Sequence, residues 1–272
     1  MNNKILDLTN PAHAYLFGFI QADGSLSEQS RNRGKLTIEI LTRDEFILEE
    51  FKKMLPVKSS ITRRTRDTNF AKDAHNSCFR VHDWAFRKEL VSLGVPCGEK
   101  SSMVKPPEVP YSDVDYWRGV IDGDGSLGIT SQNIPFISLG TSSDEMKNKY
   151  IDFVYKITGQ RKTSSRNKRD NFYNIVVSKE GAQEIVKALY YDGCLALPRK
   201  SKSSMEVLAW ERPASMIKRE HKVKKWTASE DDYILSNTLE DSMNELERTK
   251  KSIETRLWRL KNGQSLYRVL SR

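Results

Sequence analysis

The chain is poor in cysteine and has no long apolar run. Its three cysteines, Cys78, Cys97 and Cys194, are scattered, and no two stand at a Cys-x-x-Cys spacing. This absence argues against a disulfide framework and against a zinc site, so we expect reduced thiols in the core. No stretch approaches about eighteen consecutive apolar residues, which excludes a transmembrane helix, and the first residues (MNNK) begin no apolar signal core. We therefore expect a soluble, intracellular protein with no membrane association.

Charged residues, in contrast, are abundant, and the basic ones outnumber the acidic ones. Charged residues make up 30% of the 272 residues, with 45 Lys and Arg against 36 Asp and Glu and a formal net charge of +9. An excess of this sign is typical of proteins that bind a polyanion, although many basic proteins bind no nucleic acid. The hydrophobic content of 38% suffices for one large domain or about two to three small ones.

A nine-residue pattern occurs twice in the chain, as LFGFIQADG at residues 16–24 and as WRGVIDGDG at residues 117–125. Each copy is typical of the end of a buried helix, and both end in Asp-Gly. Asn10, which precedes a proline, predicts the N-terminal cap of the first helix, and Ser112, followed by Asp115, predicts that of the second. We expect the glycine of each Asp-Gly pair to leave its helix in the left-handed conformation.

The spacing within each copy predicts a close contact between the two helices. Gly18 and Ala22 lie four residues apart, as do Gly119 and Gly123. Residues four apart share one helical face, so two such faces of small residues can approach until the backbones nearly touch. The pair of helices would then form an interface.

The acids before the terminal glycines would converge at this interface. Asp23 and Asp124 stand at the helix C-termini, where the last carbonyl oxygens lack a partner within the helix and the dipole disfavours negative charge. Two carboxylates that close would force one to take up a proton unless a cation intervened. Hard oxygen ligands with open positions suit Mg²⁺. We therefore expect a Mg²⁺ site made by Asp23, Asp124 and the carbonyl groups of Ala22 and Gly123.

The two copies, with small residues and acids at the same offsets, resemble the signature of the LAGLIDADG homing endonucleases in their two-motif, single-chain form, over roughly residues 5–210. Gln21 departs from the signature, which has an acid there, but the family's metal-binding acid is the later one, matched by Asp23 and Asp124. The resemblance implies a site-specific double-strand DNA endonuclease that hydrolyses phosphodiester bonds with Mg²⁺. It would act as a monomer without a protein partner, on a long recognition site. Such enzymes are encoded in mobile introns, and we expect the protein to be with DNA in the cytoplasm or nucleoid.

Two functions of other classes fit the same residues. An intron RNA maturase would use the same surface on RNA, and a DNA-binding regulator would bind its site without cleavage. The presence of both acids, Asp23 and Asp124, argues against the regulator, because a degenerate site has no reason to keep paired carboxylates. The maturase stays open as an alternative.

A lysine ends each half of the resemblance. Lys100 and Lys200 match by position the lysine that, in the family, lies beside the scissile phosphate and offsets transition-state charge. The resemblance therefore implies that both are catalytic, together with Asp23 and Asp124. Lys202 is the competing residue in the second half, because it begins a Lys-Ser-Ser-Met sequence as Lys100 does.

The order of predicted elements repeats, and it predicts an α+β fold of two pseudo-symmetric αββαββα half-domains, residues 1–100 and 101–212. After the first signature helix, the patterns predict a strand at 35–40, a helix at 44–55, a hairpin within 57–82 and a helix at 84–93. In the second half, the corresponding basic hairpin spans 160–177 and a helix spans 180–190. Each sheet would have helices on one face and a bare face on the other. The two bare faces would form a DNA-binding saddle.

Basic residues of the predicted hairpins are expected to contact DNA phosphates and base edges. They are Arg31, Arg33, Lys35, Arg63, Arg64 and Arg66 in the first half and Arg161, Lys162, Arg166 and Lys168 in the second. Any one of them would otherwise be an ordinary solvated strand residue.

The last sixty residues differ from the rest of the chain in composition and in their predicted structure. Residues 213–225 form a basic linker without a core pattern, and residues 226–272 form a small all-α domain. The pattern Trp226-Thr-x-x-Glu-Asp, with Arg248-Thr-x-x-Ser-Ile-x-x-Arg later, resembles a Myb-like helix-turn-helix, which implies a second DNA-binding domain. The basic residues expected on the outside of its last helix are Lys250, Lys251, Arg256 and Arg259. A helical cap packed on the preceding domain is the alternative.

Overall fold

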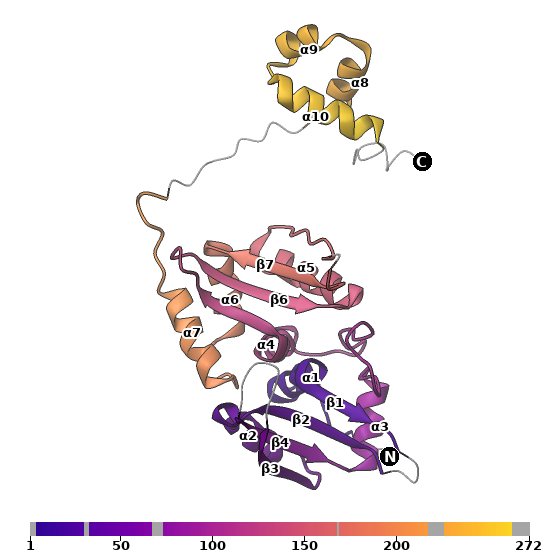
Figure 1. The fold of residues 1–272 in the computed structure, drawn as a ribbon, viewed down its shortest axis with the longest axis vertical. Helices are drawn as coiled ribbons and strands as arrows, with labels where there is room; N and C mark the ends of the chain where they lie inside the picture. The colour runs from indigo at the N-terminus through magenta and orange to yellow at the C-terminus, as the bar shows by residue number, and fades with distance from the viewer. Residues whose placement is uncertain (1–3, 30–32, 67–72, 168, 217–225, 263–272) are drawn as a thin grey trace. The chain divides into compact units, whose positions relative to one another are not determined.

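A computed structural model describes residues 4–29, 33–66, 73–167, 169–216 and 226–262 of the protein. The chain divides into two compact units, residues 1–212 (unit 1) and 213–272 (unit 2), and each is described by itself (Figure 1). Arg31, Lys168, residues 217–225 of the expected linker and the side chain of Arg66 lie outside the described residues. In the described parts of the chain, no helix combines the length and the apolar character needed to cross a membrane.

Unit 1 is a mixed α+β structure with antiparallel sheets. At its centre two helices lie side by side, α1 (Pro11–Asp23) and α4 (Asp113–Asp124) (Figure 1). The Asn10 side chain caps α1 as predicted, accepting a 2.9 Å hydrogen bond from the Ala12 nitrogen. Ser112 begins α4, but its hydroxyl donates to the Asp115 carboxylate instead of accepting from the backbone. Both helices are buried over most of their length because the core surrounds them.

The predicted contact of small residues between α1 and α4 is confirmed. A Cβ atom placed on Gly18 would clash with the carbonyl oxygen of Tyr116 and come within 3.1 Å of the Val120 nitrogen. A Cβ atom on Gly119 would likewise clash with the carbonyl oxygen of Tyr15. The contact is reciprocal, so each helix needs its own glycine.

The helix ends differ from the prediction. Gly24 has φ −76° and Gly125 has φ −90°, so neither takes the left-handed conformation. Each is instead the first residue of a strand, because the chain passes directly from the helix into the sheet. Glycine is required there by space, since a Cβ atom on Gly24 would lie 2.5 Å from the Ile20 carbonyl oxygen and one on Gly125 2.7 Å from Ile121 Cδ1.

The first sheet has four antiparallel strands in the order β1-β2-β4-β3. They are β1 (Gly24–Ser27), β2 (Lys35–Leu41), β3 (Ser59–Arg66) and β4 (Ala74–Val81), and the helices of this half are α2 (Phe46–Met54) and α3 (Trp84–Ser92). The predicted strands and helices are thus present, but a 3₁₀ turn at Thr42–Asp44 precedes α2. Glu45, the N-cap residue of α2, makes no side-chain cap hydrogen bond, and its carboxylate accepts from Arg63. Phe46, the first residue of α2, is 51% exposed.

The second sheet has three strands in the order β5-β6-β7: β5 (Gly125–Ile129), β6 (Pro135–Thr141) and β7 (Tyr173–Ser178). The predicted repeat of the αββαββα order is therefore wrong for this half. In the described part of residues 159–172, the only pairing is a single bridge between Asn167 and Phe172. Residues 160–171 contain no apolar side chain to bury against the helices, so a fourth strand has nothing to hold it to the layer beneath.

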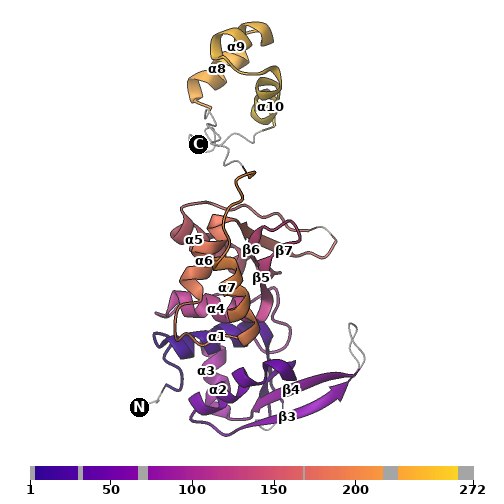
Figure 2. The ribbon, with the colours of Figure 1, turned by 90° about the vertical axis from the view of Figure 1, so that its left-hand side faces the viewer.

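The helices of the second half are α5 (Asp144–Thr158), α6 (Glu180–Leu189) and α7 (Pro198–Leu208). The sequence patterns did not predict α7. Figure 2 shows unit 1 in side view, with the strands of both sheets on one side and the helices on the other. The paired helices α1 and α4 end in the strands, so their C-termini lie where the two sheets begin.

Unit 2 contains three helices in its described part, as predicted: α8 (Ala228–Ser236), α9 (Leu239–Leu246) and α10 (Lys250–Lys261). Ile234, Ile253 and Leu260 are buried at their centre. Thr227 and Glu230 form a capping box at the start of α8, which is the structural use of the Thr-x-x-Glu pattern.

Candidate active site

Two carboxylates meet at the C-terminal ends of the paired helices. Asp23 is the last residue of α1, and Asp124 is the last residue of α4. The ends approach closely, because a Cβ atom on Gly123 would clash with Ala22 and lie 3.4 Å from Asp23 Oδ2. The predicted residues Asp23, Asp124, Ala22 and Gly123 are therefore together in space.

The electrostatics of the two acids reflect this convergence. Both side chains reach the surface, yet enough protein surrounds them that burial, followed by the negative charge of Asp124, raises the pKa of Asp23 to about 6. Burial also raises the pKa of Asp124, while Lys100 and Lys200 oppose that rise. Among the described residues, neither carboxylate accepts a hydrogen bond. Two ionised acids without donors at negative helix ends form an arrangement that a cation would relieve.

The donor set fits a hard divalent cation with open positions. In the described parts of the chain, no group of three or more His, Cys, Asp or Glu side chains could enclose a metal ion. The two carboxylates alone leave most positions around a cation free, and Mg²⁺ commonly binds with only one or two carboxylates and keeps the rest for water or phosphate. Among the carbonyl groups, that of Ala22 already accepts a 2.7 Å hydrogen bond from Lys100 Nζ.

A lysine covers each helix end. Lys100 Nζ donates to the carbonyl oxygens of Ile20, Gln21 and Ala22 at 3.1, 2.7 and 2.7 Å. Lys200 Nζ donates to those of Ile121 and Gly125 at 3.0 and 2.5 Å. Lys100 thereby covers the carbonyl groups of Gln21 and Ala22 in the last turn of α1, where a helix leaves such groups without a partner. The Ile20 and Ile121 carbonyl oxygens also accept from the Gly24 and Gly125 backbone nitrogens.

Burial lowers the pKa of both lysines to about 8, and nearby aspartates oppose the shift. In the second half, Lys200 is buried at the site, whereas Lys202 is exposed on the same helix, α7. Of the two lysines that the sequence left open, Lys200 is the one beside the end of α4.

Buried hydrogen bonds across the helix pair position these groups. Asp122 accepts hydrogen bonds from the Tyr15 and Tyr190 hydroxyls at 2.7 and 2.6 Å and from the Leu197 nitrogen at 2.7 Å. Leu197 caps the start of α7, so Asp122 fixes the helix that carries Lys200. Sequence reasoning missed this role.

At the matching place in the first half, Gln21 accepts from the Tyr116 hydroxyl at 2.6 Å and donates to the Lys105 carbonyl oxygen at 2.9 Å. Gln21 is thus a structural replacement for the acid of the other half. The signal was available in the sequence: Tyr15 and Tyr116 precede Gln21 and Asp122 by the same number of residues.

The strand register decides which basic residues of the first half face away from the helices. Lys35 alternates with buried positions and lies on the open face. Arg64, in register with Asn76, lies on the same face, whereas Arg63 is in register with Ser77 on the helix side. Arg63 donates to Glu45 at 2.8 Å. Arg33 is exposed in the connection before β2. Arg64 is therefore better placed than Arg63 to meet a ligand on the open face.

In the second half, the predicted basic residues lie in the segment without a strand. Arg161 is exposed and Lys162 partly buried. Arg166 donates to Asp144 at 2.7 Å, and its guanidinium carbon lies 4.7 Å from the centre of the Tyr173 ring. A pocket of about 200 Å³ is lined by Asp124 and Lys100 and also by Phe172 and Met146.

In unit 2 the expectation that Arg256 lies on the outside of its helix is wrong. Its guanidinium is buried and donates to both oxygens of Asp231, at 2.7 and 2.6 Å. Arg248 lies over the Trp226 ring at 3.9 Å and donates to Glu230 at 2.9 Å. The residues of the Myb-like pattern therefore hold the unit together. The helical period signals this, because Arg256 shares a face with the buried residues Ile253 and Leu260.

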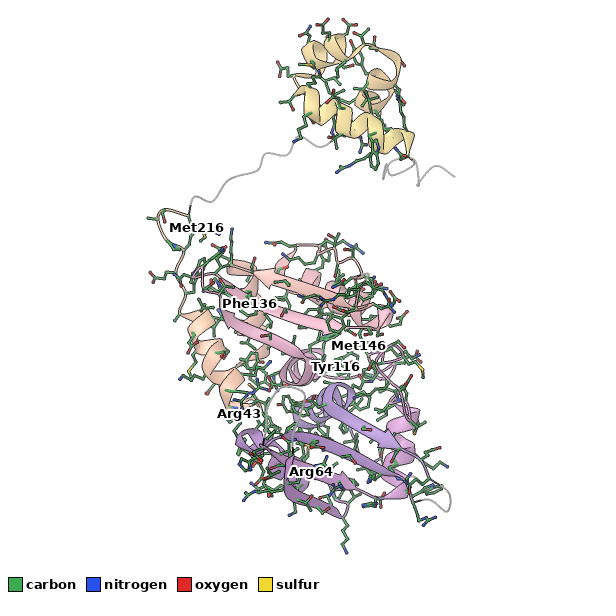
Figure 3. The ribbon with its side chains drawn as sticks, in the orientation of Figure 1. Arg43, Arg64, Tyr116, Phe136, Met146 and Met216 are labelled. Atoms are coloured by element: carbon green, nitrogen blue, oxygen red, sulfur yellow. The ribbon has the colours of Figure 1, made fainter. Side chains whose placement is uncertain are left out.

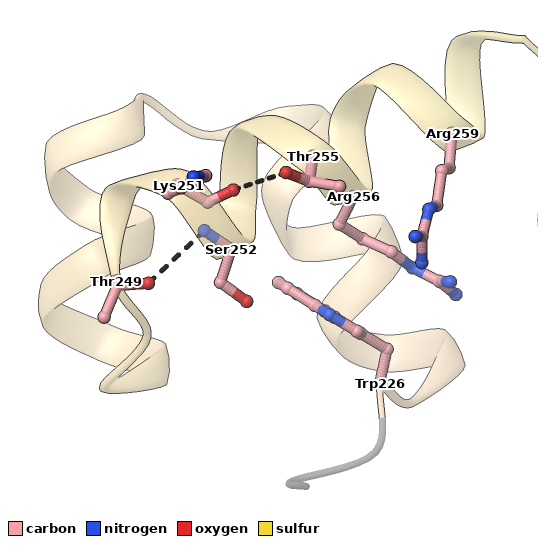
Figure 4. Close-up of a pocket in the computed structure, with 7 residues that line it drawn as sticks. All are labelled: Trp226, Thr249, Lys251, Ser252, Thr255, Arg256 and Arg259. Atoms are coloured by element: carbon pink, nitrogen blue, oxygen red, sulfur yellow. Dashed lines mark hydrogen bonds between the residues drawn. The ribbon is translucent and has the colours of Figure 1, made fainter. Parts of the chain in front are cut away.

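The other three predicted DNA-contacting residues of α10, Lys250, Lys251 and Arg259, are exposed. Lys251 and Arg259 line a pocket of about 300 Å³ next to Trp226 (Figure 4). Thr249 begins the helix, and its hydroxyl accepts a hydrogen bond from the Ser252 nitrogen. Unit 2 thus presents a basic surface on its last helix.

Comparison with known proteins connects the first half to one family. Residues 10–82 match the family model of the LAGLIDADG-like domain. No curated sequence matches the chain. Among solved structures, the chain is similar to the LAGLIDADG homing endonuclease I-GzeII in complex with a DNA target, with 14% identity and a TM-score of 0.49 over 72% of this chain and 88% of that one.

Two further structures give similar values. The homing endonuclease I-WcaI bound to its DNA recognition sequence has 16% identity and a TM-score of 0.49, over 74% of this chain and 87% of that one. Mesophilic variants of the homing endonuclease I-DmoI have 14% identity and a TM-score of 0.48, over 72% of this chain and 97% of that one. Likeness at these values carries no conclusion about function, which depends on the site itself.

Proposed function

We propose that unit 1 is a Mg²⁺-dependent, site-specific endonuclease that cleaves both strands of DNA and acts as a monomer. The observation that carries the proposal is the meeting of Asp23 and Asp124 at the ends of the paired helices, each with a lysine beside it. The match of residues 10–82 to the LAGLIDADG-like domain supports it, as does the formal net charge of +9.

The two carboxylates would hold Mg²⁺, with the carbonyl group of Gly123 and that of Ala22 as further oxygen ligands. Bound there, Mg²⁺ would supply Lewis acidity toward a phosphate and lower the pKa of a coordinated water. The Ala22 carbonyl oxygen accepts from Lys100, so a ligand role for it requires sharing with that ammonium group or its movement. No side chain of the site needs to act as the nucleophile.

The lysines would act on the phosphate. Lys100 and Lys200 place an ammonium group at the end of each helix, where a scissile phosphate of either strand would lie beside the carboxylates. A positive charge held in position stabilises the negative charge that develops on the phosphate oxygens. A pKa of about 8 lets each lysine also exchange a proton near neutral pH.

DNA would lie along the open faces of the two sheets, which begin directly after Asp23 and Asp124. The two halves, residues 1–100 and 101–212, would each bind one half-site. Unit 2 would bind adjacent DNA through Lys250, Lys251 and Arg259, as an additional domain without a catalytic group. Exposed cations on one helix suit phosphate contacts that position a protein on DNA.

A cleavage assay tests the proposal. The full chain would be incubated with DNA that contains the uninterrupted insertion site of its own gene, with Mg²⁺ or with EDTA. We expect a double-strand cut at one position in Mg²⁺ and none in EDTA. Specific binding without a cut would favour the DNA-binding regulator, and activity only on the splicing of the host RNA would favour the maturase; either result would overturn the proposal.

A further inference from the structure

The open faces of the two sheets differ in chemistry. On the first sheet, the strand register shows which residues face away from the helices. Among those whose side chains the structure describes, four are charged. They are Lys35, Glu39, Arg64 and Arg80. Polar side chains such as Thr37 and Thr62 fill much of the remainder. This face is built for hydrogen bonds and for ionic contacts.

The open face of the second sheet carries no charge. Its residues, all within the described strands, are Ser126, Gly128, Phe136, Ser138, Gly140, Asn174, Val176 and Ser178. Val176 is 46% exposed. Phe172, whose ring lies against Gly140, is 39% exposed. Figure 3 labels one side chain of each face, Arg64 and Phe136. This face offers apolar groups, small hydroxyls and the amide of Asn174.

The contrast is sharpest at two positions that correspond between the halves. Gly24 pairs with Ile38, and Gly125 pairs with Leu139, so the next residues, Glu39 and Gly140, occupy matching places near the carboxylates. Glu39 accepts hydrogen bonds from Arg64 Nε at 3.1 Å and from Asn76 Nδ2 at 3.0 Å.

Gly140 is covered by the Phe172 ring, since a Cβ atom on it would lie 2.7 Å from Phe172 Cε1. A side chain at this position is excluded, and the ring takes its place. At this position the first half therefore presents Arg64, which is held by Glu39, whereas the second half presents the ring of Phe172.

These chemistries recognise different bases. An arginine offers a planar fork of donors that suits the two acceptors of guanine, and Glu39 orients the fork by occupying its Nε edge. Apolar side chains contact the methyl group of thymine, and serine hydroxyls bind either base edge. The uncharged face has no guanidinium or ammonium group for guanine, and the amide of Asn174 suits the adjacent donor and acceptor of adenine.

Resting on the proposed function, we infer that the DNA target of unit 1 is asymmetric in composition. The half-site under β1–β4 contains guanines read by Arg64 and its neighbours, and the half-site under β5–β7 is rich in thymine and read by Phe136, Phe172 and Val176. DNA is the occupant that fits the uncharged face, because β5 begins at Gly125, directly after Asp124, and the face continues the surface beside the carboxylates.

Selection from a randomised DNA library tests the inference. The full chain would be presented with duplexes randomised over a long site, and cleaved molecules would be sequenced. We expect strong guanine preference on one side of the cut and thymine preference on the other. Arg64→Ala should lower guanine discrimination at one position by roughly 10-fold or more. Val176→Ser should lower thymine discrimination at one position of the other half by roughly fourfold, the value of about one buried methyl group.

The outcomes separate this inference from the proposed function. Absence of cleaved molecules under all conditions would contradict the nuclease itself. Cleavage of sites whose two halves have the same base composition would overturn the inference alone, and so would an altered profile in the wrong half for either variant. Lys149→Ala, which removes an exposed charge on α5, is the matched control, and thermal melting would verify that Arg64→Ala and Val176→Ser are folded.

Discussion

The Tyr15 hydroxyl of α1 donates a 2.7 Å hydrogen bond to the Asp122 carboxylate of α4. Tyr116 of α4 returns a 2.6 Å hydrogen bond to the Gln21 side chain of α1. The two bonds cross the same buried interface in opposite directions, and the two backbones approach closely there at Gly18 and at Gly119. They fix the helix pair whose ends carry the candidate active site.

The two tyrosines form a matched pair for mutation. Tyr15→Phe removes a donor from a buried carboxylate, whereas Tyr116→Phe removes one from a neutral amide. Asp122 keeps its hydrogen bonds from Tyr190 and Leu197, but a hydrogen bond to a charged group contributes about 1.5–3 kcal/mol, against about 0.5–1.5 kcal/mol for a neutral pair. We expect both variants to melt lower than the parent protein, with the larger decrease for Tyr15→Phe. Thermal melting measures both, and a larger decrease for Tyr116→Phe would contradict the assigned geometry.

Because Gly18 and Gly119 each face the backbone of the other helix, a larger side chain at either position should lower the stability of the protein. Gly18→Leu and Gly119→Leu would each force a side chain into the facing backbone, an overpacking cost of about 1–3 kcal/mol or more. We expect both variants to unfold at lower temperature or to aggregate. Lys149→Leu, which adds the same side chain on the exposed surface of α5, should change the melting temperature little. Unchanged midpoints for both glycine variants would mean that the helices do not pack through these faces.

Metal binding should stabilise unit 1 in a pH-dependent way. The pKa of Asp23 is raised from 3.8 to about 6, so ionised Asp23 disfavours the folded state; this penalty is full above about pH 6, shrinks as the pH falls below 6 and is gone below pH 3.8. A cation needs the ionised form. Mg²⁺ at about 100 times its Kd adds about 2.7 kcal/mol, and we expect a clear rise in melting temperature at pH 7.5 that shrinks at pH 5.

The same melting experiment has an internal control. Asp23→Asn removes the charge that repels Asp124, so the metal-free variant should melt higher than the parent at pH 7.5 and gain little from Mg²⁺. Asp152→Asn, on the exposed surface of α5, should keep the response of the parent protein. A response to Mg²⁺ that is equal at pH 5 and pH 7.5 would argue against these carboxylates as ligands.

Local patterns predicted the helix pair because it follows from short-range rules. Small residues four apart, an Asn-Pro start and the Asp-Gly ends indicated α1 and α4 and brought Asp23 and Asp124 to one place. The same rules failed at Gly24 and Gly125, where close packing and not a left-handed turn requires glycine. Sequence spacing alone does not distinguish these two reasons.

Other features depend on contacts between distant residues. The described part of the second half forms no fourth strand because residues 160–171 offer nothing apolar, although their charge resembles that of the first hairpin. Arg63 and Arg64 are neighbours in sequence but lie on opposite faces of the sheet. Arg256 is buried by its ion pair with Asp231, which only its helical period could have indicated.

Removal of unit 2 separates binding from cleavage. A chain of residues 1–212 keeps the hydrogen bonds of Arg212 to Glu180, at 2.6 and 2.7 Å, and so ends at an anchored residue. We expect it to cleave at high protein concentration, with a shorter footprint, weaker binding and a salt dependence that is shallower by roughly 0.9 for each phosphate that unit 2 would have bound. An unchanged footprint with a lowered melting temperature would instead indicate that residues 226–272 serve as a stabilising cap.

The most direct test compares cleavage and DNA binding in Asp23→Asn and Asp124→Asn. Each change keeps the shape of the side chain and removes one carboxylate, so the account predicts a loss of double-strand cleavage in Mg²⁺ of at least about 100-fold. Mobility-shift assays should find DNA binding as tight as that of the parent protein or tighter, because a negative charge facing the phosphates has been removed. Full double-strand cleavage by either variant in Mg²⁺ would contradict the account.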